Sequence, residues 1–157
     1  MHTKLDRVIG ISKLDLKGAG LRNLPALNGS ALSWSLGPAH LLVTCAAGER
    51  DGLMEQVSSS PDVWVTDVTS VFAHFRVAGE HSREVLRKLT SLNISAGALP
   101  RLACGQTRVS QVHTIILRLG AESAPAFHIL VSREYGQSVW DAILHAGEEF
   151  HLEVLSH

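Results

Sequence analysis

The sequence lacks most features that mark redox, membrane or nucleic-acid-binding proteins. Its two cysteines, Cys45 and Cys104, form no CxxC motif, so they fit a reducing compartment and cannot build a disulfide framework. A net charge of −1 supplies no basic patch for nucleic acid or anionic lipid. The longest apolar run, in "VHTIILRLG", is far shorter than the ~20 residues of a membrane helix. The start also lacks the apolar core of a signal peptide, and we therefore expect a cytoplasmic protein.

The composition is that of an ordinary globular protein. The chain has 157 residues, of which 45% are hydrophobic and 18% charged, and this length suits one domain with an appendage. Glycine and proline interrupt residues 1–30 too often for a regular element. We expect these residues to form an extended arm whose leucines are covered by partner chains, followed by one domain over residues 31–157. The leucines of the arm that need cover are Leu14, Leu16, Leu21, Leu24 and Leu27.

Hydrophobic periodicity in residues 31–157 predicts alternating strands and helices. Strand-like segments lie at residues 31–37, 40–45, 63–79, 106–120 and 127–132. Helical patterns lie at residues 48–60, 80–92 and 134–150. Trp140 lies on the apolar stripe of the last helix, so we expect it to be buried. Helices that return across an antiparallel sheet indicate an α+β fold of split-βαβ type, with the helices at 80–92 and 134–150 on one face.

Cys104 is the first candidate for catalysis because it precedes Gly105 at the entrance to a strand. A nucleophilic thiol needs a cation or a helix N-terminus to lower its pKa and a histidine as base. Arg101 is close in sequence, but nothing fixes its direction. We therefore interpret Cys104 as a structural residue.

Metal and phosphate motifs are weak. Nine histidines occur without HxH, HxxxH or HExxH spacing. His113 and His128 could face each other across a hairpin, where a polar pair is favoured over a metal site. The Gly18–Gly20 segment has neither the third glycine nor the helix of a dinucleotide-binding loop, and a GxSxG motif is absent. We expect no catalytic, cofactor-binding or metal-binding residues in this chain.

Four segments, taken in order, carry a family resemblance: "LGPAHLLVT" (36–44), "VTDVTSVFAHFRVAGEHSREVLRKL" (65–89), "LNISAGALPRLACGQTRVSQVHTIILR" (92–118) and "FHILVSREYGQSVWDAILHAGEEF" (127–150). Together they resemble the gamma subunit of heterotetrameric sarcosine oxidase over about residues 33–152. The sequence departs from the family pattern at His40, Asn93 and Ser95, where an aromatic residue, Asp and His are usual. These departures leave open whether the substrate is sarcosine or another N-methyl amino acid.

The resemblance implies a fold related to the folate-binding domain of aminomethyltransferases. It also implies a non-catalytic subunit in sarcosine catabolism and one-carbon metabolism, assembled with alpha, beta and delta subunits. The complex would demethylate sarcosine oxidatively to glycine, with 5,10-methylenetetrahydrofolate and hydrogen peroxide as products. FAD, covalently held FMN, NAD and tetrahydrofolate would then be held by the partner chains, and none by this chain.

Two other functions stay open from the residues alone. A free-standing folate or pterin binder needs an acidic residue for the pterin ring and a cation for the glutamyl tail. Asp67 could supply the first, and Arg101 or Arg108 the second. A homo-oligomeric enzyme with an unrecognised site is the remaining alternative.

Overall fold

The computed structural model describes residues 2–156, which fold into two compact units. The first unit contains the chain up to Ile9 and again from Val71 onward, and the second is Gly10–Ser70. The chain therefore crosses between the units twice. The sequence predicts an arm over residues 1–30 followed by one domain. The structure differs from this prediction, because residues of the predicted arm form strands in the sheets of both units.

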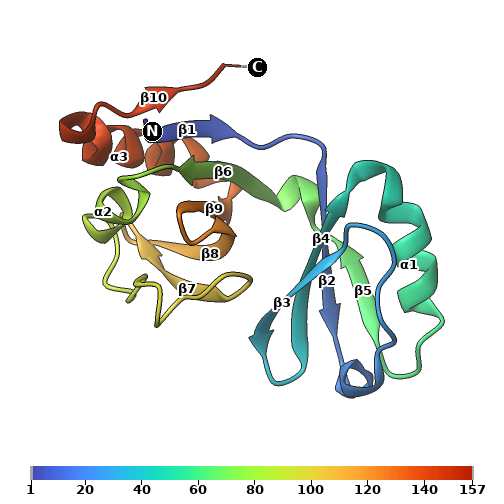
Figure 1. Cartoon of the computed structure of the whole chain (residues 1–157). Helices are drawn as coiled ribbons and strands as arrows, with labels where there is room; N and C mark the ends of the chain where they lie inside the picture. Colours follow the sequence, from blue (N-terminus) through green and yellow to red (C-terminus); the bar gives the residue numbers. More distant parts are fainter. Residues whose placement is uncertain (1, 157) are drawn as a thin grey trace. The chain divides into compact units, whose positions relative to one another are not determined.

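The first unit is built on a six-stranded sheet with the strand order β10-β1-β6-β9-β8-β7 (Figure 1). Its strands are β1 (Lys4–Arg7), β6 (Phe72–Ala78), β7 (Cys104–Val109), β8 (Val112–Ala121), β9 (Ala124–Ser132) and β10 (Glu153–Val154). β10 pairs with β1 in parallel, and the other described pairs of this sheet are antiparallel. β10 and β7 are the two edges.

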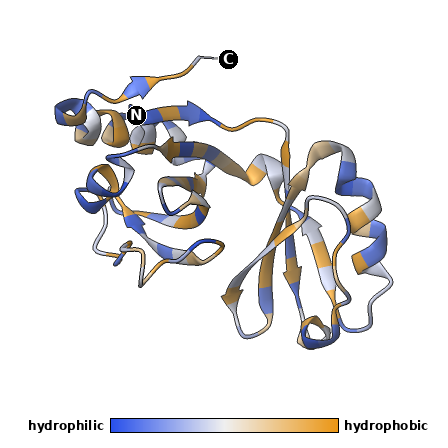
Figure 2. Cartoon of the chain, in the orientation of Figure 1, coloured by the Kyte–Doolittle hydropathy of each residue, from blue (hydrophilic) through white to orange (hydrophobic). Residues whose placement is uncertain are grey.

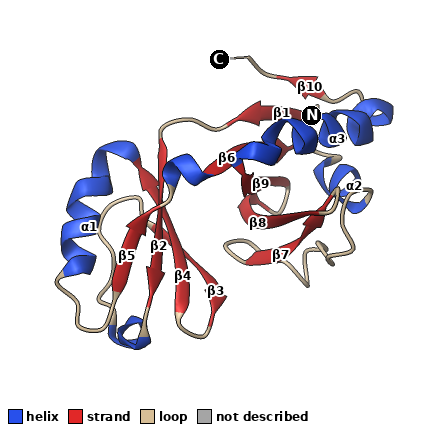
Figure 3. Ribbon diagram, turned by 180° about the vertical axis from the view of Figure 1, so that it is seen from behind, coloured by secondary structure: helices blue, strands red, loops and turns tan. Residues whose placement is uncertain are grey.

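Two helices, α2 (Ser82–Arg87) and α3 (Gly136–Gly147), cover one face of this sheet. Figure 3 shows α3 beside β6, and α3 also packs against β9. The short 3-10 turns η4 (Arg133–Tyr135) and η5 (Glu148–Phe150) flank α3. The α+β class with antiparallel strands and helices on one face is therefore confirmed. The core between helices and sheet includes Leu5, Phe75, Val77, Val85, Leu86, Ile116, Phe127, Ile129, Val139 and Ile143.

The second unit has a four-stranded antiparallel sheet with the order β3-β4-β2-β5. Its strands are β2 (Ile11–Lys17), β3 (Leu32–Gly37), β4 (His40–Ala46) and β5 (Trp64–Asp67). The helix α1 (Arg50–Ser58) packs its buried residues Leu53 and Val57 on this sheet. Figure 2 shows hydrophilic and hydrophobic segments alternating along α1 and along the strands. The remaining 3-10 turns are η1 (Ala19–Asn23), η2 (Ala47–Glu49) and η3 (Thr69–Val71).

The extended arm predicted for residues 1–30 is not observed. Leu14 and Leu16 are fully buried in β2, where Leu14 lies opposite Val43 of β4. The partly buried Leu21 and Leu24 pack against the same core, as does Leu27. The chain itself buries Leu14 and Leu16 and partly covers the other three, so these leucines do not depend on a partner chain for all of their cover. Deleting residues 1–30 would remove β1 and β2, which are interior strands of the two sheets. The deletion should therefore unfold the chain itself, and not only weaken its assembly with partner chains.

Two predicted strands are each divided in two. Residues 63–79 form β5 and β6, which belong to different sheets. Residues 106–120 form parts of β7 and β8, which are joined by a tight turn at Ser110 and Gln111, with φ of 50° and 69°. Two-residue hairpin loops usually place Gly or Asn at such positions. Because neither residue is present here, the turn gives no sequence signal.

Gly79 lies in a turn that a side chain would strain. Its φ is 118°, and an added Cβ would lie 2.5 Å from the His2 carbonyl oxygen and 2.8 Å from the Thr3 Cα. We expect Gly79→Ala to lower the free energy of unfolding by about 1–3 kcal/mol, measured by urea denaturation. Gly97→Ala is the control, because an added Cβ there meets nothing within 4 Å. Equal unfolding midpoints for the two variants would contradict this view of the Gly79 turn.

Candidate functional site

Asp67, the acidic candidate, lies at the end of β5 and is held on both carboxylate oxygens. Its Oδ1 accepts hydrogen bonds from the Thr69 hydroxyl at 2.6 Å and the Thr69 backbone N–H at 2.9 Å. Its Oδ2 accepts a bond from Arg50 Nη1 at 2.9 Å. The Thr69 hydroxyl, with help from Arg50, holds the pKa of Asp67 below its ordinary value despite partial burial. Asp67 is therefore an ionised carboxylate with a structural role in joining β5 to α1.

A buried lysine extends this cluster to β2. The Lys13 backbone N–H donates to the Thr69 hydroxyl at 2.9 Å, and its Nζ donates to the Ile11 carbonyl at 3.3 Å. Burial lowers the pKa of Lys13, and the charge of Asp67 opposes that shift. Lys13, Arg50, Asp67 and Thr69, which we call the Asp67 cluster, tie together β2, β5 and α1.

The Asp67 cluster predicts a pH-dependent stability. We expect Asp67→Asn to lower the free energy of unfolding at pH 7 by about 1–3 kcal/mol, because charged hydrogen bonds are lost. The pKa of folded Asp67 is depressed, so its stabilisation is complete above the ordinary aspartate pKa of about 3.9 and is lost as the pH falls through the lower folded value. The difference between parent and variant should therefore shrink in urea unfolding at about pH 3.

Asp51→Asn is the matched control, because Asp51 also bonds Arg50 but its side chain is 86% exposed. Exposed ion pairs contribute about 0–1 kcal/mol, so its effect should be small at both pH values. A loss for Asp67→Asn that stays constant down to pH 2 would show that the carboxylate charge is not the cause.

The cationic candidates Arg101 and Arg108 lie in the first unit, whereas Asp67 lies in the second. Both arginines are exposed. Neither unit by itself brings Asp67 together with one of them, so these residues do not form a folate pocket within either unit. Arg108 borders a cavity of about 550 Å³ between the β7–β8 turn and the start of α3. That cavity is lined by Arg108, Ser110, Gln111, Val112, His113, Ser132, Tyr135 and Ser138.

The two cysteines lack the environment of a reactive thiol. Burial raises the pKa of Cys104, which begins β7. Burial also raises the pKa of Cys45 in β4, and the nearby charges of Glu49 and Asp67 add to the effect. Both thiols are thus held in the neutral form, which is a poor nucleophile.

The hypothesis that His113 faces His128 is wrong. His113 lies opposite Arg108, and His128 lies opposite Leu117. His128 Nδ1 is instead 2.7 Å from Nε2 of His74 on the neighbouring strand β6. Strand periodicity gives the face on which a side chain lies but not its register, so this pairing could not be derived from spacing.

Other described features bear on cofactors and membranes. Among residues 2–156, no three His, Cys, Asp or Glu side chains gather as a metal site would require. An added Cβ at Gly18 or Gly20 would collide with the backbone carbonyls of Asp62 or Pro61, so these glycines allow close chain packing. Within the same described range, no helix is long and apolar enough to cross a membrane.

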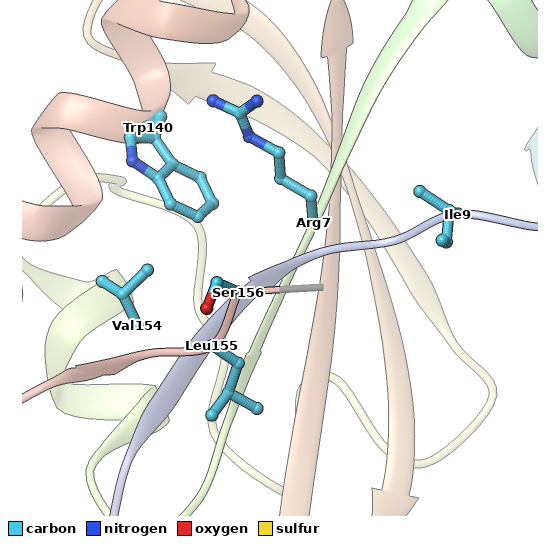
Figure 4. A pocket seen from close by; sticks show the side chains of 6 residues that line it. All are labelled: Arg7, Ile9, Trp140, Val154, Leu155 and Ser156. Carbon is cyan, nitrogen blue, oxygen red and sulfur yellow. The ribbon is translucent and has the colours of Figure 1, made fainter.

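An apolar pocket of about 390 Å³ lies in the first unit between β1, α3 and the end of the chain (Figure 4). Its lining residues are Arg7, Ile9, Trp140, Val154, Leu155 and Ser156. The sequence did not indicate this pocket because its residues come from opposite ends of the chain. The alternation in "HLEVLS" was the available signal for a final edge strand.

Comparison with known proteins identifies the family of this chain. The model of the GCVT N-terminal domain matches residues 29–156. The chain belongs to the GCVT N-terminal domain family. It is 33% identical over 93 residues to sarcosine oxidase subunit alpha of Corynebacterium sp. (strain U-96), a match that covers 58% of this chain and 10% of that subunit. It is 30% identical over 109 residues to aminomethyltransferase of Geobacillus thermodenitrificans (strain NG80-2), covering 69% of this chain and 30% of that enzyme.

Two solved structures share the fold of this GCVT-type chain. A chain of the heterotetrameric sarcosine oxidase from Corynebacterium sp. U-96, in complex with pyrrole 2-carboxylate, matches with a TM-score of 0.78 at 17% identity. Aminomethyltransferase T of the glycine cleavage system from Bartonella henselae matches with a TM-score of 0.71 at 12% identity. The second match covers 98% of this chain and 48% of that one. The resemblance to aminomethyltransferase folds is confirmed, and the chain spans less than a third of the curated relatives named above.

Proposed function

We propose that this chain is a non-catalytic subunit, of the gamma type, in a heterotetrameric sarcosine oxidase. Mutual coverage carries the proposal: the structural match spans 98% of this chain and 88% of the matched chain in the Corynebacterium oxidase. In the alpha subunit from the same strain, by contrast, 93 matched residues are 10% of the length. The oxidase therefore contains a chain that has this fold and is matched over most of its length, which supports a gamma-type role.

The chemistry of the described residues supports a non-catalytic role. The carboxylate of Asp67 is held by Arg50 and Thr69, and both cysteines are held as neutral thiols. FAD, covalently held FMN, NAD and tetrahydrofolate would be bound by the alpha and beta chains, with a delta chain completing the complex. The complex would demethylate sarcosine to glycine, or oxidise a related N-methyl amino acid in the same way.

Co-expression tests the proposal. The chain is produced alone and together with alpha, beta and delta chains, and each preparation is assayed for flavin absorbance and sarcosine-dependent hydrogen peroxide. We expect the chain alone to carry no flavin and no activity, and to co-purify with active oxidase when the partners are present. A chain that binds flavin or oxidises sarcosine by itself would overturn the proposal.

The folate-binding alternative has a separate test. Isothermal titration of the isolated chain with tetrahydrofolate should give no measurable heat if the folate site is on the partner chains. Saturable binding that Asp67→Asn weakens would favour the free-standing folate or pterin binder instead.

A further inference from the structure

The edge strand β10 leaves backbone hydrogen-bonding groups available. The N–H groups of Glu153 and Leu155 donate to the carbonyls of Thr3, just before β1, and of Leu5 in β1, each at 2.9 Å. In a parallel ladder this alternation turns the N–H and C=O of the intervening Val154 away from β1. Within residues 2–156 no strand lies on that outer side, because β10 ends the sheet order. An exposed sheet edge of this kind is a template for an additional strand.

Apolar side chains gather beside this edge. Ile9 is 76% exposed and Val154 is 46% exposed, and both line the apolar pocket with Leu155 and Trp140 (Figure 4). Val154 shares a sheet face with its neighbour Leu5, which is the face covered by α3. A strand added beside β10 would point every second side chain to the sheet face that α3 covers. The pocket lies on that face, so such a side chain could enter it.

Arg7 gives the pocket a positive charge. Its guanidinium lies 5.1 Å from the centre of the Trp140 ring, and its side chain is exposed. No carboxylate of residues 2–156 forms an ion pair with it. When a guanidinium stacks on an indole, its N–H donors still point outward in the guanidinium plane. They can therefore bind a carboxylate that lies in that plane.

We propose that β10 and the apolar pocket bind an extended segment of a large partner chain. The segment adds a strand beside Val154, places one aliphatic side chain in the pocket, and presents a carboxylate on the same strand face to Arg7. This mode combines main-chain hydrogen bonds for affinity with side-chain pockets for specificity. The inference rests on the proposed function, because it supplies the docking site for the alpha chain, the long chain of such an oxidase.

A second copy of this chain fits the site less well. Two β10 strands paired across a twofold axis would place Val154 opposite Val154. Glu153 shares a face with Lys4, whereas Val154 and Arg7 lie on the opposite face. The copy would therefore bring no carboxylate from β10 to Arg7, which a foreign acidic segment would do.

Two substitutions address the two contacts separately. Val154→Pro removes an N–H that the described sheet does not use, and edge strands tolerate proline. Arg7→Glu reverses the charge at the pocket. Arg108→Glu is the matched control, because it makes the same charge change on β7, the other edge of the same sheet. Urea unfolding of each variant shows whether its fold is kept.

The measurement is the Kd between each purified chain and the immobilised subcomplex of alpha, beta and delta chains, by surface plasmon resonance. We expect Arg7→Glu and Val154→Pro each to raise the Kd by about tenfold or more, with Arg108→Glu unchanged. If the parent binds and both variants bind equally well, the docking site is refuted and the proposed function stands. If the parent does not bind at all, both are refuted. A homodimer in sedimentation that Val154→Pro abolishes would assign the edge to a second copy and overturn the inference.

Discussion

Replacing Arg118 by alanine is expected to lower the free energy of unfolding by about 2–5 kcal/mol, mainly because it removes a buried apolar stem that packs on Phe127. Arg118 lies on β8 and is fully buried. Its guanidinium donates to the carbonyls of Leu119, Gly120 and Ala121 at the end of β8 and pairs with Glu122 of the β8–β9 turn at 3.2 Å. Burial lowers the pKa of Arg118, and the nearby charge of Glu122 opposes that shift.

Arg118→Met separates packing from charge. Methionine keeps an apolar stem over Phe127, whose ring centre lies 5.5 Å from the guanidinium carbon, but it supplies no donors. Glu122 is 56% exposed, so water can replace part of the ion pair and hydrogen bonds that the methionine variant loses. We expect the methionine variant to lose less than half as much stability as the alanine variant in urea denaturation. Equal losses would show that the hydrogen bonds, and not packing, dominate.

Trp140→Ala is expected to cost about 3–5 kcal/mol of unfolding free energy, because it leaves a cavity between α3 and the sheet. Trp140 is 9% exposed, and its ring contacts Phe75 with centroids 5.2 Å apart. Its predicted burial on the helix stripe is therefore confirmed. The same change at Trp64, which is 67% exposed on β5, should alter stability by less than about 0.5 kcal/mol.

The pair of tryptophan variants makes this test specific. Both lose the same side chain, so a difference in unfolding midpoint measures burial and not composition. Similar midpoints for Trp140→Ala and Trp64→Ala would mean that α3 does not pack through Trp140.

The sequence predicted the elements better than their assembly. The apolar stripe of α3 identified that helix because the 3.6-residue period requires no knowledge of its neighbours. The β2 segment "ISKLDLK" also alternates, yet glycines on both sides led to the prediction of an arm. Alternation along "VWVTDVTSVFAHFRVAG" could not reveal that β5 and β6 join different sheets. Which strand pairs with which is decided by long-range contacts that a local period does not contain.

The same limit applies to the candidate sites. Arg7 and Trp140 are far apart in sequence, so local spacing could not place them around one pocket. His74 and His128 meet through the register of β6 and β9. By contrast, the low reactivity expected of Cys104 followed from its position before a strand. The pKa raised by burial is consistent with that expectation.

If this chain is a non-catalytic subunit of an oxidase, it must be present in the purified, active complex. The most direct test is native mass spectrometry of the oxidase purified through a tag on its alpha chain, after co-expression with this chain. We expect one copy of the 16.9 kDa chain in each active complex, beside the flavin-carrying chains. An active oxidase whose mass excludes this chain, together with a free chain that stays monomeric in its presence, would contradict this expectation.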